Sequence, residues 1–98
     1  MEIVNVVNSL AALAQENRIR VFRHLVQAGP QGLAAGQLAE ELGLAAATLS
    51  FHLKELKHAG LINCTRKGRS LIYAPNFEHM QTLINFLLEN CCCGECSS

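Results

Sequence analysis

Apolar side chains recur every three or four residues over most of the chain, which is the spacing of amphipathic helices. The pattern predicts helices over 2–15, 16–29, 34–43, 44–60 and 76–90. Glycines follow the apolar positions of three of these segments and are expected to end the helices, while Asn76 is suited to cap the last one. Only Leu38 and Leu42 of the third helix are predicted to point inward. The apolar positions at helical spacing in the other helices are Ile3, Val6, Val7, Leu10 and Leu13, then Ile19, Phe22, Leu25 and Val26, then Leu49, Leu53 and Leu56, and finally Phe77, Met80, Leu83, Ile84, Leu87 and Leu88.

The period changes between the last two helices. Two short β-rich runs, 61–66 and 70–74, flank Lys67-Gly68-Arg69, which predicts a hairpin. Before it, a tight link joins the third and fourth helices, as in a helix-turn-helix. The expected fold class is therefore mostly α with a β-hairpin wing, a winged helix-turn-helix over residues 1–90, followed by a tail over 91–98. Helix pairs with tight turns also occur in proteins that bind no DNA.

Charge and composition narrow the class of protein. The chain has 98 residues, half of them hydrophobic, and eight basic residues balance eight acidic ones. Basic residues nevertheless gather in 17–27 and 61–73, which is compatible with a basic edge on a neutral molecule. No apolar run is long enough to span a membrane and the first residues do not resemble an export signal, so we expect a cytoplasmic protein. No phosphate loop or nucleophile motif indicates an enzyme.

Four of the five cysteines lie within six residues, in the sequence ENCCCGECSS. An odd number of cysteines does not suit a complete disulfide framework, and thiols stay reduced in the cytoplasm. We therefore expect these thiols to be free, metal-bound or redox-active. Thiolates select soft acceptors such as Cu(I), Zn(II), Cd(II) and trivalent arsenic. Cys64 is separate, shares a strand face with Ile62, and is predicted to be a small packed hydrophobe.

Two stretches carry a resemblance to a known family. SLAALAQENRIRVFRHL, residues 9–25, and TLSFHLKELKHAGLINCTRKGRSLIYAP, residues 48–75, resemble the arsenical-resistance repressors of the ArsR/SmtB type. The second stretch is the more specific, because it combines a helix, its cap and a basic wing. The resemblance implies a homodimer built through the first and last helices. It also implies double-stranded operator DNA as the partner, released when a soft metal or metalloid binds.

The chain departs from the family pattern in its thiols. Many members carry a cysteine pair on the third helix, whereas AAGQLAEELG has none. Glu89 to Cys92 instead resembles the subset of arsenite sensors whose thiols follow the last helix. This resemblance implies a repressor of an arsenic-resistance operon, induced by As(III) or Sb(III). Its metalloid ligands would be Cys91, Cys92 and either Cys96 or Cys93, with Cys96 favoured.

Geometry adds one requirement for such a site. Successive side chains of a helix point about 100° apart. Neighbouring thiols can therefore bind the same metal or metalloid atom only where the helix unwinds. Gly94 supplies that freedom. Other readings stay open: a zinc clip using all four thiols, a sensor of persulfide or oxidant, or a thiol metal-binding protein without a DNA function.

The fourth helix is expected to read DNA. Base edges are expected to meet its exposed start, at Ala46, Ala47, Thr48, Ser50 and Phe51. Basic side chains on that helix and on the hairpin suit phosphates, namely Lys54, Lys57, Arg66, Lys67 and Arg69. Packing under the wing is the alternative for Phe51. His52 is expected to be a core histidine bonded to backbone.

Overall fold

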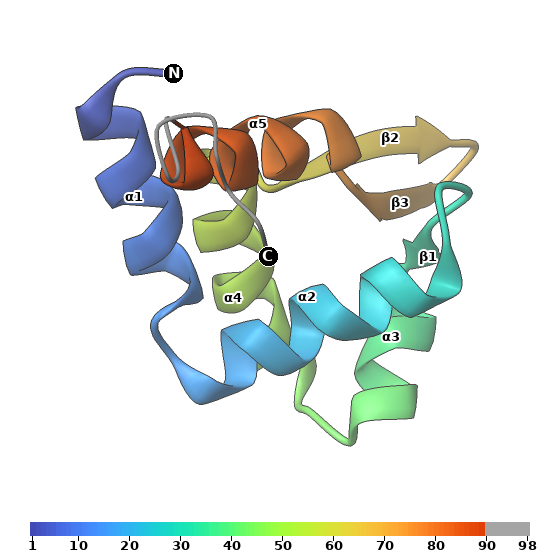
Figure 1. Ribbon diagram of the computed structural model, residues 1–98. Coiled ribbons are helices and arrows are strands. Elements are labelled where there is room, and N and C mark those ends of the chain that lie inside the picture. Colours follow the sequence, from blue (N-terminus) through green and yellow to red (C-terminus); the bar gives the residue numbers. More distant parts are fainter. Residues whose placement is uncertain (90–98) are drawn as a thin grey trace.

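Five helices and a three-stranded antiparallel sheet make up the computed structural model, which describes residues 1–89 (Figure 1). The winged helix-turn-helix predicted from the sequence is confirmed. The elements follow in the order α1 (Ile3–Leu13), α2 (Glu16–Ala28), β1 (Leu33–Ala34), α3 (Ala35–Leu42), α4 (Ala46–His58), β2 (Ile62–Lys67), β3 (Ser70–Pro75) and α5 (Phe77–Leu88).

Local interactions explain where the helices begin and end. The Gln15 side chain accepts a hydrogen bond from the Arg18 amide at the start of α2. The Asn76 side chain accepts one from the His79 amide at 3.0 Å, so the predicted cap of α5 is confirmed. Gly43 ends α3 with a left-handed backbone, φ 67°, which reverses the chain before α4.

The sheet has the strand order β1-β3-β2. Lys67 pairs with Ser70, which leaves Gly68 and Arg69 at the tip of the β2–β3 hairpin. β1 was not predicted, because a two-residue strand is too short to show a period of two. It pairs Leu33 with Tyr73 and so fastens the start of α3 to the wing.

The core lies where α2, α3, α4 and the base of the hairpin meet. Its members without solvent exposure include Val21, Leu25, Leu38, Leu56 and Leu61. The predicted stripe of α2 was wrong in part. Ile19 and Val26 are 43% and 39% exposed, and Val21 takes an inward position instead.

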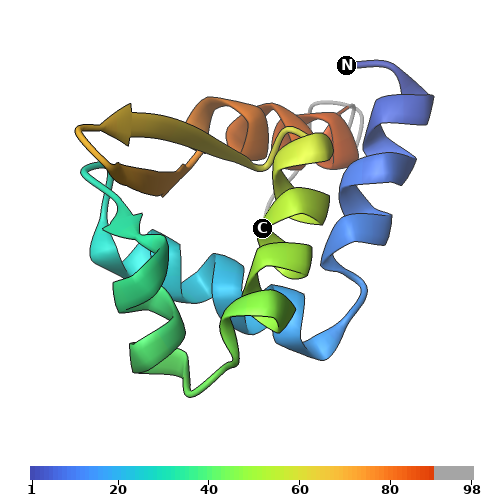
Figure 2. The same cartoon turned by 180° about the vertical axis from the view of Figure 1, so that it is seen from behind.

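The hairpin tip and α1 lie at opposite ends of the molecule, with α4 between them (Figures 1 and 2). The inward residues of α1 are Val6, Ser9 and Ala12. Apolar residues of α1 and α5 remain exposed, namely Ile3, Val4, Val7, Leu10, Ile84, Leu87 and Leu88. Within residues 1–89, every helix is too short or too polar to cross a membrane.

Candidate nucleic-acid interface

One face of α4 enters the core and the other is open to solvent. Leu49, His52, Leu53 and Leu56 are buried. All seven residues of α4 that the sequence assigned to DNA lie outside the core and are exposed: Ala46, Ala47, Thr48, Ser50, Phe51, Lys54 and Lys57. The helix therefore presents small, polar and basic side chains beside each other, as a helix in the major groove does.

The start of α4 is also free of a side-chain cap. Ala45 occupies the N-cap position, where it has no oxygen to offer the first amide groups of the helix. Uncapped amides at a helix N-terminus carry partial positive charge and suit a phosphate.

The hairpin contributes a second basic element. Arg66, Lys67 and Arg69 are exposed at or beside its tip. Among the described residues, the ion pairs are Arg20 with Glu16 and His24 with Glu41, so neither wing arginine is held by an acidic partner. The guanidinium groups of the wing are therefore available to phosphates.

Phe51 stands on the exposed side of α4 beside a residue that the sequence did not single out. Its side chain is 54% exposed, which excludes the alternative of packing under the wing. The guanidinium carbon of Arg18, from the first turn of α2, lies 5.4 Å from the centre of the Phe51 ring. The helical phase of Arg18, three residues before the buried Val21 and seven before Leu25, places it on the inward side of α2 but does not indicate Phe51 as its partner.

His52 is a core residue, as predicted, with 5% of its surface exposed. Its ring meets that of Phe51 edge-on, with centres 5.8 Å apart. Burial lowers the pKa of His52, and the nearby charge of Arg18 lowers it further. The expected bond to backbone is not seen at Nδ1, which has no partner within residues 1–89.

The C-terminal end of α4 meets α1 and α5 at one junction. Ser9 of α1, which has no exposed surface, shares a hydrogen bond of 2.8 Å with Nε2 of His79 on α5. The same hydroxyl donates to the carbonyl of Ala59, the C-cap of α4, at 3.5 Å. His79 therefore ties α5 to both α1 and the end of the recognition helix.

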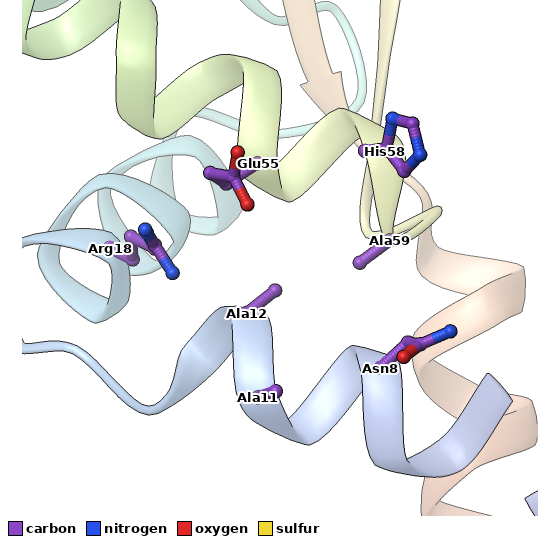
Figure 3. Close-up of a pocket in the computed structure, with 7 residues that line it drawn as sticks. All are labelled: Asn8, Ala11, Ala12, Arg18, Glu55, His58 and Ala59. Atoms are coloured by element: carbon purple, nitrogen blue, oxygen red, sulfur yellow. The ribbon is translucent and has the colours of Figure 1, made fainter. Parts of the chain in front are cut away.

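A cavity of about 390 Å³ lies between α1 and α4, close to this junction (Figure 3). Arg18 and Glu55 lie together on one side of it, and Asn8, His58 and Ala59 on the other. Ala11 and Ala12 complete its wall. Arg18 thus borders the cavity while it contacts Phe51.

Comparison with known proteins agrees with this geometry. A family model described as a helix-turn-helix domain matches residues 13–65, more than half of the chain. The transcriptional repressor SdpR of Bacillus subtilis is 31% identical over 81 residues, which cover 83% of this chain and 87% of that protein. The chain belongs to the ArsR/SmtB family of transcriptional regulators.

Two further relatives show how far the likeness extends. The regulator NmtR of Mycobacterium tuberculosis is 32% identical over 80 residues, covering 82% of this chain and 64% of NmtR. The chain therefore spans about two thirds of NmtR. Mb0332 of Mycobacterium bovis, described as a homodimeric winged helix-turn-helix DNA-binding domain and a possible ArsR-family regulator, superposes with a TM-score of 0.69 at 24% identity. That alignment covers 91% of this chain and 82% of the Mb0332 domain.

The cysteines of the chain, which are its candidate metal ligands, lie in two places. Cys91, Cys92, Cys93 and Cys96, the predicted ligands, lie outside the described residues. Within residues 1–89, no three His, Cys, Asp or Glu side chains are grouped closely enough to hold a metal ion. Cys64 is half-buried on β2 opposite Tyr73. Burial raises the pKa of Tyr73, and a hydrogen bond with Cys64 adds to this.

Proposed function

We propose that the protein is a homodimeric repressor of an arsenic-resistance operon, released from operator DNA when trivalent arsenic or antimonite binds cysteines that follow α5. The observation that carries the DNA-binding part is the exposure of all ten predicted contact residues on α4 and the wing. The cysteine tail, placed directly after α5 in the sequence, carries the inducer part.

The dimer is supported by apolar surface on α1 and α5. Val7 and Leu87 are 55% and 54% exposed, and their apolar neighbours on the same helices are exposed as well. Contiguous apolar surface of this kind is normally covered by a partner, and most homo-oligomers are two-fold dimers. The homodimeric fold neighbour Mb0332 is consistent with a second copy. Two copies would place two α4 helices about one DNA turn, ~34 Å, apart on an inverted repeat.

The division of labour on DNA follows from the side chains. The guanidinium and ammonium groups of Arg66, Lys67 and Arg69 would bind phosphates and fix the register of the protein. Ser50 and the methyl groups of α4 would meet base edges, where an alanine or an aromatic ring contacts the thymine methyl. Loss of a wing arginine should weaken binding to all sequences, whereas loss of Ser50 should weaken operator binding more than binding to random DNA.

Soft-ion chemistry supports the inducer. Trivalent arsenic binds three thiolates in a trigonal pyramid, and three thiols on one short segment meet this need. Zn(II) prefers four ligands in a tetrahedron, and the Cys93-x-x-Cys96 spacing is favourable for zinc as well. Because α5 ends at Leu88, the first thiol follows the helix by only three residues. Ligand binding at Cys91 and Cys92 would therefore act on the end of a helix that also forms the dimer.

The experiment is an induction assay with matched cysteine variants. A fluorescent DNA fragment from upstream of the protein's own gene is bound, then titrated with arsenite and separately with zinc. Cys91→Ser and Cys92→Ser should bind DNA normally and lose release by arsenite, while Cys64→Ser, the matched control, should respond like wild type. Full induction of both tail variants would show that the ligand assignment is wrong. Release by zinc alone would favour the zinc clip.

A further inference from the structure

Arg18 occupies an unusual place for a charged side chain in the first turn of a helix. Its Nε atom is shielded from solvent and has no hydrogen-bond partner within the described part of the chain. Glu55 lies beside Arg18 on the same side of the cavity, yet the two side chains do not form an ion pair. The close partner of the guanidinium is the ring of Phe51, 5.4 Å away.

Phe51, in turn, is more than half exposed, and the other ring beside it is that of His52, which meets it edge-on. An exposed phenylalanine on a helix normally samples several rotamers. A cation over one face of the ring restricts this sampling, because the guanidinium is attracted to the negative face of the aromatic system.

We propose that Arg18 is a positioning residue for DNA reading, which holds the Phe51 ring in the orientation that meets base edges. This inference rests on the proposed function, since it requires α4 to lie in the major groove. Arg18 itself need not touch DNA. It would act from α2, and it would make the apolar contact of Phe51 with thymine methyl groups more selective by fixing the ring before DNA arrives.

The alternative role of Arg18 is an ordinary phosphate contact, and the two roles have different signatures. A phosphate contact strengthens binding to every DNA sequence. It also adds about 0.9 to the slope of log K against log salt. A positioning residue changes the ratio of operator to non-operator affinity and leaves the slope unchanged. The shielded Nε favours the second role, because that edge of the guanidinium faces protein and not solvent.

The test is a double-mutant cycle on the full chain with Arg18→Gln, Phe51→Leu and the two combined. Affinity is measured for the operator fragment and for a scrambled duplex between 50 and 300 mM KCl. Arg18→Gln should weaken operator binding about 5- to 30-fold, the range of two exposed cation–π contacts, one in each subunit of the dimer, with scrambled DNA and the salt slope unaffected. The double variant should be no weaker than Phe51→Leu alone, and Arg18→Lys, which keeps the cation, should restore most of the loss.

Two results would overturn the inference while operator binding by wild type stands: additive effects of the two substitutions, or a salt slope lowered by one to two in Arg18→Gln. If wild type does not prefer the operator to scrambled DNA, the proposed function itself fails, and the inference with it. NMR of the free protein supplies a test that needs no Arg18 variant. The Arg18 side-chain protons should be shifted by the Phe51 ring current, and this shift should vanish in Phe51→Leu. An unshifted Arg18 in wild type would also refute the contact.

Discussion

Removing both wing arginines should change the salt dependence of DNA binding by an amount that the structure allows us to calculate. Arg66 and Arg69 are exposed, and neither has an acidic partner in the described residues. Each can therefore neutralise one phosphate, and a dimer would lose four such contacts in Arg66→Ala/Arg69→Ala. At ~0.9 per contact, the slope of log K against log salt should flatten by about 3.6. Between 50 and 200 mM salt, the affinity of wild type for DNA should therefore fall about 150-fold more than that of the variant.

The assay is fluorescence anisotropy of a labelled operator at five or more KCl concentrations. The matched control, Arg20→Ala/Arg23→Ala, removes the same charge from α2. There Arg20 already pairs with Glu16, and Arg23 borders a groove shared with Phe77 and Met80 of α5. The control should keep nearly the wild-type slope. The wing variant should unfold at the wild-type temperature, because the wing arginines are exposed and make no ion pair within the described residues. An unchanged slope in Arg66→Ala/Arg69→Ala would show that the hairpin does not lie on the phosphates.

Three further outcomes are expected. Leu87→Glu should convert the dimer to monomer in sedimentation at micromolar concentration. Ile19→Glu, at an exposed apolar site on α2 (43% exposed, against 54% for Leu87), should not, and a wild-type monomer would refute the dimer. Asn76→Ala should lower the free energy of unfolding by about 1 kcal/mol in urea denaturation, because the His79 amide loses its cap, and no loss would contradict that role. Stability should fall as the pH drops below about 6.5: the pKa of His52 is lowered in the fold, so the unfolded chain binds the proton more readily. His52→Gln should flatten this dependence, and an unchanged pH profile in that variant would exclude His52 as its source.

The sequence predicted those parts of the fold in which the spacing of apolar residues repeats several times or in which a distinctive turn occurs. α4 has four inward residues in register, and the wing has a glycine between basic residues and two β-rich runs. The exposure of the predicted DNA-contact residues on α4 followed from its pattern, because the exposed face of a helix is fixed once its buried face is known. β1 was missed because its pairing with β3 depends on how the chain folds around α3 and not on local pattern.

The errors have tertiary causes. In α2, Ile19 and Val26 were placed on one face with Phe22 and Leu25 because they are apolar, yet the helix buries Val21 and leaves Ile19 and Val26 exposed. The contact of Arg18 with Phe51 joins residues 33 positions apart, a distance over which a single sequence carries no pairing signal. The cysteine tail was found from the clustering of cysteines in the sequence, and its ligand assignment stays a prediction because the described residues end before it.

Release of DNA by the tail would require a path from the end of α5 to the recognition helix. α5 has 12 residues and is ~18 Å long, and His79 lies in its first turn, at the end of the helix that is remote from Leu88. A helix of this length moves as a rigid body, and His79 would carry the motion to Ser9 and to the C-cap of α4. The His79 ring also lies beside Gly60, where an added Cβ would be only 3.1 Å from it, so α5 packs closely on the chain that follows α4. A coupling of ~1–3 kcal/mol is typical of allosteric proteins, and a single hydrogen bond contributes ~0.5–1.5 kcal/mol. Loss of the Ser9–His79 bond in the arsenic-bound state would therefore supply a substantial share of the required coupling, without any contact between the thiols and α4.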